Sequence, residues 1–250
     1  MHKSPVYALD FDGVICDSAI ETGITGWKVA RQLWQEMPNE PSTEMIDLFR
    51  LVRPVMETGF EAILIMRLLF EGMHAETLLN HFPTSITAMI KRDKLDINQL
   101  KKLFGNTRDQ WINDNLEEWI EMNPLFSGII NKFEKIDSDP CYIITTKQER
   151  FVSQIFEANN IKVPAERIFG LDRNLSKQQI LANLLVQHPT QTILFVEDRL
   201  PTLINVVNDS RLTDVELFFA TWGYNTASDK RAARKLPMVT TINLDEMLNL

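Results

Sequence analysis

The chain has 250 residues, of which 44% are hydrophobic and 24% charged, a composition of ordinary soluble globular proteins that argues against extended disorder. Its length is enough for one large domain or two modest ones, each with its own core. With 34 acidic against 26 basic residues the net charge is −8, and no dense basic run occurs, so we expect no nucleic-acid partner.

Two further absences bound the class of protein. No segment reaches the length of a membrane span, and residues 1–5 do not begin a leader peptide, so we expect no membrane partner. The two cysteines, Cys16 and Cys141, are too far apart in sequence for a compact metal-binding motif, and a chain of this size does not need a disulfide. We therefore expect reduced thiols and a cytoplasmic location.

The first predicted element is a strand over 6–9, an apolar run that ends in Asp10-Phe11-Asp12-Gly13. The glycine permits a sharp turn, so the two carboxylates would lie on the loop that leaves the strand. In an open α/β sheet, ligands bind beyond the carboxyl ends of the strands, which makes this loop a candidate site. Asp and Gly are also common in plain solvated turns, and this segment alone does not separate the two interpretations.

The stretch from residue 18 to 122 is predicted to be almost entirely helical, because apolar residues such as Ile20, Ile24 and Trp27 recur at helical spacing. The pattern is broken at Pro54, Gly59 and Gly72. A last helix would carry residues 112–120, with Thr107 as its N-cap. We expect the tryptophans of this region to form its core rather than a stacking platform; they are Trp27, Trp34, Trp111 and Trp119.

From residue 124 onward, predicted helices and strands alternate, which indicates a parallel sheet. Helices are expected over 129–136 and around 152–156, and strands at 141–144, 168–169, 193–196 and 217–220. Because the first strand must pair with these later strands, the long helical stretch is an insertion. The predicted domains are an α/β core of residues 1–17 and 123–250 and an all-α domain of residues 18–122.

Polar side chains follow the ends of the later strands as well. Thr145-Thr146-Lys147 follows the strand at 141–144, and Glu197-Asp198 follows the strand at 193–196. Between them, Ser176-Lys177 begins a predicted helix. Since parallel strands place their carboxyl ends on one edge of the sheet, these residues should converge with the first loop on a single crevice.

Taken in order, these motifs resemble those of the haloacid dehalogenase superfamily, in its phosphatase-type branch with an inserted helical cap. The family's first motif, Asp-x-Asp-Gly-Val/Thr after strand one, matches residues 10–14, and its second, an apolar strand ending in Thr or Ser, matches 143–145. The third, a lysine near a helix start, is best matched by Lys177, and the fourth, an apolar strand ending in an acidic pair, by 195–198. Four motifs in order make the resemblance specific. It implies an α/β, Rossmann-like parallel core with an all-α cap.

The resemblance also implies a covalent phosphoryl-transfer chemistry. Asp10 would attack phosphorus and form an aspartyl-phosphate, while Asp12 would protonate the leaving alkoxide and then activate water. Thr145 would hydrogen-bond a phosphoryl oxygen, and Lys177 would offset its negative charge. Mg²⁺ would be held by the carboxylates of Asp10 and Asp198 and by the backbone carbonyl of Asp12, a set of hard oxygen ligands. Gly13 and Thr146 would contribute to substrate binding.

Several of these assignments have a rival in the sequence. Lys147, next to Thr145 and Thr146, could supply the positive charge in place of Lys177, and either threonine could hold the phosphoryl oxygen.

The fourth motif departs from the commoner Gly-Asp form. Glu197 is therefore a second candidate for a metal ligand or for a partner of one, and Thr202 stands where many relatives have a further Asp. Asp17, just beyond the first loop, is expected to be a helix cap or a surface residue rather than a ligand.

The predicted function is that of a Mg²⁺-dependent phosphomonoesterase acting on a small soluble phosphorylated metabolite, as a monomer or homodimer, with the helical domain closing over the site. The second Asp of the first motif argues against dehalogenation, because halide leaves without a proton. A phosphomutase of the same superfamily is one alternative. A low-activity ligand-binding or regulatory protein is another, suggested by the unusual 197–202 stretch.

Overall fold

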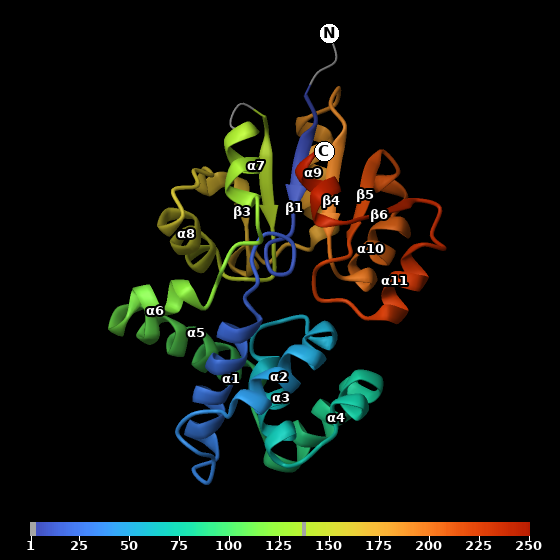
Figure 1. Cartoon of the computed structure of the whole chain (residues 1–250). Helices are drawn as coiled ribbons and strands as arrows, with labels where there is room; N and C mark the ends of the chain where they lie inside the picture. Colours follow the sequence, from blue (N-terminus) through green and yellow to red (C-terminus); the bar gives the residue numbers. More distant parts are fainter. Residues whose placement is uncertain (1–3, 137–138) are drawn as a thin grey trace. The chain divides into compact units, whose positions relative to one another are not determined.

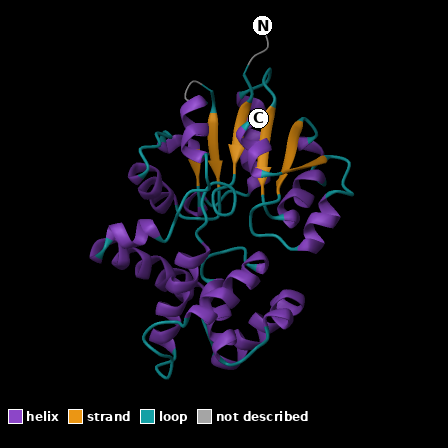
Figure 2. Cartoon of the chain, viewed as in Figure 1, coloured by secondary structure: helices purple, strands orange, loops and turns teal. Residues whose placement is uncertain are grey.

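The computed structural model describes residues 4–136 and 139–250, which fold into two compact units (Figure 1). One unit comprises Met1–Asp17 and Leu125–Leu250, and the other comprises Ser18–Pro124. The first is an α/β unit built on a sheet, and the second is all-helical (Figure 2). Each unit has its own hydrophobic core.

The α/β unit is organised by one parallel sheet with the strand order β3-β2-β1-β4-β5-β6. The strands are β1 Val6–Leu9, β2 Cys141–Ile144, β3 Ile168–Phe169, β4 Ile193–Glu197, β5 Val215–Ala220 and β6 Val239–Ile242. Every neighbouring pair is parallel, and β1 lies centrally, with Tyr7 in register with Cys141 on one side and with Leu194 on the other. The predicted parallel α/β fold is confirmed; β6 is an additional edge strand.

Helices cover both faces of this sheet (Figures 1 and 2). They are α7 Ile129–Lys135, α8 Glu149–Ala158, α9 Lys177–Gln187, α10 Leu200–Val207, α11 Ala227–Ala233 and α12 Leu244–Leu248. Because strands buried on both faces need apolar side chains throughout, β1, β2 and β4 are continuous apolar runs up to their last residues. The residues at the strand ends are therefore the first places where polar groups can enter the unit.

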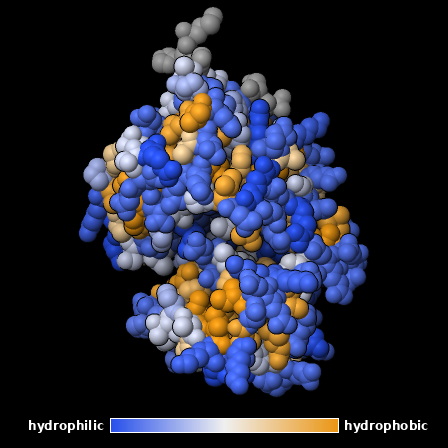
Figure 3. Space-filling view, turned by 180° about the vertical axis from the view of Figure 1, so that it is seen from behind, coloured by the Kyte–Doolittle hydropathy of each residue, from blue (hydrophilic) through white to orange (hydrophobic). Residues whose placement is uncertain are grey.

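The helical unit contains α1 Ala19–Leu33, α2 Thr43–Val52, α3 Glu61–Phe70, α4 Ala75–Asp93, α5 Ile97–Asp114 and α6 Leu116–Glu121. Trp27, Trp111 and Trp119 are buried, and Trp34 is partly buried against the same core, as expected for core tryptophans. On the face shown in Figure 3, the broadest hydrophobic area lies on this unit. Its exposed large hydrophobic side chains are Leu51, Ile97 and Leu116.

The predicted cap at Thr107 is wrong, because Thr107 lies in the middle of α5. That helix begins after Asp96, whose carboxylate accepts hydrogen bonds from the backbone N–H groups of Asn98 and Gln99. The next helix, α6, is a separate short element capped by Asn115, whose side-chain oxygen accepts from the backbone N–H of Glu118. The apolar pattern runs across both helices, so it does not reveal the break between them.

Two other sequence expectations concern the chain as a whole. Among the residues that the structure describes, neither Cys16 nor Cys141 forms a disulfide, and both are buried. Within the described residues, no helix combines the length and the apolar character needed to cross a bilayer.

Candidate active site

The first loop of the α/β unit carries the Asp-x-Asp pair. Asp10 follows β1 directly, and its backbone N–H donates to Val196 O of the neighbouring strand (3.0 Å), so its position is fixed by the sheet itself. Phe11 is fully buried and packs edge-on against Phe156, with ring centroids 5.4 Å apart. The loop then closes tightly, because Cys16 N donates to Phe11 O (3.0 Å). Asp10 and Asp12 thereby stand on either side of a buried aromatic anchor.

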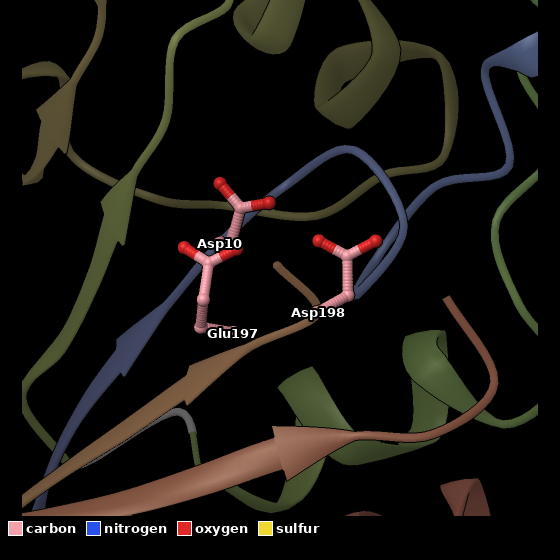
Figure 4. A group of neighbouring side chains, drawn as sticks. All are labelled: Asp10, Glu197 and Asp198. Carbon is pink, nitrogen blue, oxygen red and sulfur yellow. The ribbon is translucent and has the colours of Figure 1, made fainter. Parts of the chain in front are cut away.

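Three buried carboxylates gather at the carboxyl ends of β1 and β4 (Figure 4). Asp10, Glu197 and Asp198 each offer an oxygen, and these three oxygens lie within 4.8 Å of one another. Figure 4 shows the three side chains rising on the same side of the two adjacent strands. The sequence prediction that the two strand ends bring their acidic residues together is borne out by this geometry.

Lys177 lies between two of these carboxylates. Its Nζ donates to Asp10 Oδ1 (2.6 Å) and to Glu197 Oε2 (2.7 Å). Lys177 is the first residue of α9, and the capping box formed by Ser176 and Gln179 fixes the start of that helix. A local sequence signal, Ser-x-x-Gln, therefore places the lysine at the cluster.

The rival lysine, Lys147, is in the site as well. It is buried, and its Nζ donates to Asp12 Oδ1 (3.0 Å). The Thr145 hydroxyl accepts a hydrogen bond from the Lys147 backbone N–H (3.0 Å), which leaves the hydroxyl proton to be donated elsewhere. Thr146 is half-buried between them. The structure thus brings together both lysines that the sequence offered as alternatives, and it gives each a different carboxylate.

Glu197 already has partners for both of its oxygens. Oε2 accepts from Lys177, and Oε1 accepts from the backbone N–H of Arg199 (2.9 Å). Asp10 is bonded to Lys177 through Oδ1, and Asp198 accepts from the Tyr224 backbone N–H (2.5 Å) through Oδ2. The contacts of Glu197 suit a partner of Lys177, whereas Asp10 and Asp198 fit a hard divalent cation better.

The charge balance of the site also favours a bound cation. When all are ionised, four carboxylates (Asp10, Asp12, Glu197 and Asp198) face two ammonium groups (Lys147 and Lys177), so two negative charges are in excess. The pKa of Asp10 is raised to about 7, mainly by burial and also by the charges of Glu197 and Asp12, while Lys177 opposes the shift. Burial lowers the pKa of Lys177, but the two carboxylates outweigh this and hold it above its usual value. A divalent cation would offset the excess charge.

Close packing around Asp198 explains the glycine of the first motif. Gly13 has φ +92°, and a Cβ there would lie 2.1 Å from Asp198 Oδ2. The backbone N–H of Gly13 is used within the loop, where it donates to Cys16 O (2.9 Å). Gly13 therefore makes room for Asp198, and its assignment as a substrate-binding residue stays a prediction.

Sequence reasoning missed one residue that shapes this site. Tyr224, in the loop after β5, donates through its backbone N–H to Asp198 and through its hydroxyl to Asp17 Oδ1 (2.8 Å). Asp17 is therefore a hydrogen-bond partner of Tyr224, and the N-cap position of α1 is Ser18 instead. The Trp-Gly-Tyr stretch was visible in the sequence, but nothing local indicated which residues it would contact. Thr202 lies in α10 and is half-buried.

The parallel sheet of this strand order carries an Asp-x-Asp loop after its central strand and a helical unit inserted directly after that loop. The chain shares this fold with solved structures that are named haloacid dehalogenase-like. The fold expected from the sequence resemblance is confirmed. No family model matches the sequence, and no curated protein matches it. The likeness is found among solved structures.

Three of these similar structures illustrate it. A haloacid dehalogenase-like hydrolase from Streptococcus pneumoniae is 19% identical, with a TM-score of 0.57, and the match covers 98% of this chain and 97% of that one. A predicted phosphoglycolate phosphatase from Haemophilus somnus is 15% identical, with a TM-score of 0.61 and coverage of 100% and 98%. A predicted phosphatase from Clostridium acetobutylicum is 14% identical, with a TM-score of 0.57 and coverage of 99% and 98%. At these identities the likeness is one of fold.

Proposed function

We propose that this protein is a phosphomonoesterase that hydrolyses a small phosphorylated metabolite through an aspartyl-phosphate on Asp10. The observation that carries the proposal is the contact of Lys177 Nζ with Asp10 Oδ1 at 2.6 Å, in a cluster that also holds Asp198. A carboxylate that must approach a phosphate dianion needs positive charge beside it, and this contact supplies it. The names of the similar phosphatase structures support the same reaction class.

In the first step, a carboxylate oxygen of Asp10 attacks phosphorus and the bond from phosphorus to the ester oxygen breaks. Asp12 gives its proton to the leaving alkoxide. In the second step, Asp12 takes a proton from water, whose oxygen attacks the same phosphorus, so that inorganic phosphate leaves and the Asp10 carboxylate is restored. The Thr145 hydroxyl and the Lys177 ammonium are proposed to hold the phosphoryl oxygens in line for both steps.

We propose Mg²⁺ as the cofactor. The carboxylates of Asp10 and Asp198 would hold it, together with the backbone carbonyl of Asp12, and Glu197 would act mainly by orienting Lys177. When bound, the cation neutralises negative charge on the carboxylates and on the phosphoryl group. Nothing in the donor set is soft, which favours Mg²⁺ over metals that prefer nitrogen or sulfur.

The proposal is tested by phosphate release from p-nitrophenyl phosphate and from a panel of metabolite phosphomonoesters that includes phosphoglycolate, with Mg²⁺ and with chelator. We expect Mg²⁺-dependent release from the wild-type protein and none from Asp10→Asn. Asp47→Asn, a change of an exposed aspartate in the helical unit, is the matched control and should keep full activity. Equal activity of Asp10→Asn and wild type would refute the nucleophile assignment.

Two other functions remain as outcomes of the same experiment. Isomerisation of a sugar phosphate that requires a bisphosphate, without net phosphate release, would indicate a phosphomutase. Tight binding of phosphorylated compounds with no turnover of any ester would indicate a ligand-binding protein.

A further inference from the structure

Among the charged groups described at the candidate active site, the buried Lys147 has no role in the proposed mechanism. Lys147 has only 1% of its side-chain surface exposed, and its Nζ donates to Asp12 Oδ1 at 3.0 Å. Burying an ammonium group costs free energy unless it is paired, so its place in the site calls for an explanation. Asp12 is the carboxylate to which the proton transfers are assigned.

We propose that Lys147 is a positioning residue for Asp12, holding one carboxylate oxygen so that the other is presented to the leaving group and to water. This inference rests on the proposed function. Lys147 engages Oδ1, while the side chain of Asp12 keeps 16% of its surface exposed and so remains accessible. A proton donor that rotates freely spends little time in the productive geometry. The contact with Lys147 restricts the rotation of the Asp12 carboxyl group.

The backbone of Lys147 is anchored on two sides, as a positioning role requires. Its N–H donates to Thr145 Oγ1 (3.0 Å), and its carbonyl accepts from the Leu171 backbone N–H (3.0 Å). Gly170 packs so closely that a Cβ on it would lie 2.6 Å from the Lys147 carbonyl oxygen. The lysine therefore extends from a loop whose path is fixed by the neighbouring β3 connection.

The far end of the side chain is guided as well. Lys147 Nζ lies 5.9 Å from the centroid of the buried Phe11 ring, within the range of a cation–π contact. Phe11 is the residue between the two aspartates. The same aromatic ring thus separates Asp10 from Asp12 and lies beneath the ammonium group that reaches Asp12.

The two lysines divide the carboxylates between them. Lys177 contacts Asp10 and Glu197, and Lys147 contacts Asp12. If Lys147 instead bound the transferred phosphoryl group, its loss would weaken phosphate binding and would slow all esters alike. The division of contacts favours a role confined to proton transfer, and the two roles give different kinetics.

The test compares Lys147→Met and Lys147→Arg on two substrates: p-nitrophenyl phosphate, whose leaving group needs little protonation, and an alkyl phosphate that the wild-type protein hydrolyses. Because water activation by Asp12 is a step common to both esters, the comparison uses kcat/KM, which reports only the steps up to phosphoryl transfer to Asp10. Lys147→Met should lower kcat/KM for the alkyl ester by about 10- to 100-fold, and kcat/KM for the nitrophenyl ester by less than about fivefold. Lys147→Arg, which keeps a donor for Asp12, should recover part of the lost kcat/KM.

A double variant makes the assignment specific. Lys147→Met should add nothing to the loss caused by Asp12→Asn, because both act on the same step. Binding of inorganic phosphate, measured by calorimetry, should be unchanged in Lys147→Met and weakened in Lys177→Met. Lys162→Met, at an exposed lysine of the same unit, is the matched control and should behave as wild type.

Equal losses on both esters, weaker phosphate binding by Lys147→Met, or multiplied losses in the double variant would each overturn the proposal. If Lys147→Met fails to fold, Lys147→Gln is measured in the same way, since its amide can still donate to Asp12. Its alkyl-ester kcat/KM should then lie between those of wild type and Asp12→Asn. A wild-type protein that hydrolyses no ester would refute the proposed function instead, so the two failures are distinguishable.

Discussion

The two units each contain a buried ion-pair network, and the networks differ in charge balance. In the helical unit, Glu21 accepts from Arg108 Nε (2.7 Å) and Nη2 (2.5 Å), and also from Thr25 Oγ1 and Trp119 Nε1. In these contacts one acid pairs with one base, and neutral groups donate further hydrogen bonds to the same carboxylate. In the α/β unit, acids outnumber bases around Lys147 and Lys177. A balanced network suits structure, whereas an excess of buried negative charge indicates a place that a cation or a proton must complete.

The sharpest way to test this contrast is to remove carboxylates from the unbalanced network one at a time. Asp198→Asn should weaken Mg²⁺ binding by more than about 100-fold, because it removes a proposed ligand, whereas Glu197→Gln should weaken it by about tenfold through its partner Lys177. Calorimetric titration with magnesium chloride measures both affinities. The reverse order of effects would make Glu197 the ligand and Asp198 its support.

The balanced network should respond in stability rather than in ligand binding. Glu21→Gln leaves the Arg108 guanidinium buried without its counter-charge, and we expect it to lower the free energy of unfolding by about 3 kcal/mol. Urea denaturation measures the change. Combining Glu21→Gln with Arg108→Met should restore part of the loss, because the uncompensated charge is gone. A double variant less stable than Glu21→Gln alone would show that packing around Arg108, and not charge balance, dominates.

The unbalanced network should also make stability depend on pH. The pKa of Asp10 is about 7 in the folded protein against 3.8 as its reference value, so the folded state binds this proton more tightly. Its contribution to stability is fully present at low pH and is lost as the pH rises through about 7. The free energy of unfolding of the metal-free wild type, relative to Asp10→Asn, should therefore fall between about pH 4 and about pH 7 and level off above that. A rise over that range would contradict the assignment.

The smallest expected effect concerns the helix break that the sequence pattern concealed. Asn115→Ala removes the side-chain cap of α6 and should cost about 1 kcal/mol of unfolding free energy. Thr107→Ala, in the middle of α5, should change stability by less than about 0.5 kcal/mol. Thermal denaturation of the two variants side by side compares them, and equal losses would argue against a cap at Asn115.

The strands were predictable where burial dictates composition. β1 and β2 have the predicted bounds, because a central parallel strand is an unbroken apolar run that ends where polar residues begin. β6 escaped prediction because it lies at the edge of the sheet, where Thr240 and Thr241 interrupt the apolar pattern. An edge strand needs only part of its surface buried, so its composition resembles that of a loop.

The candidate site was predictable in part: the location of its residues followed from the sequence, but their contacts did not. Topology alone brings the ends of β1, β2 and β4 to one edge, so the convergence of their polar residues could be anticipated. The individual pairings could not. That Lys147 reaches Asp12 and Lys177 reaches Asp10 depends on loop paths and on the start of α9, and the contact of Tyr224 with Asp198 depends on the loop after β5.

The segment that leads out of the α/β unit, at residues 15–16, lies next to the segment that leads back into it, at residues 125–126. Cys16 pairs with Leu125 in an antiparallel bridge, and Phe126 N donates to Ile15 O (3.0 Å). Bridged residues have Cα atoms about 5 Å apart, a gap that a few glycine and serine residues can span. The helical unit can therefore be treated as a replaceable insertion. A chain in which a short linker joins Asp17 to Leu125 would keep every strand of the sheet and all four carboxylates. We expect the same junction to accept other inserted domains.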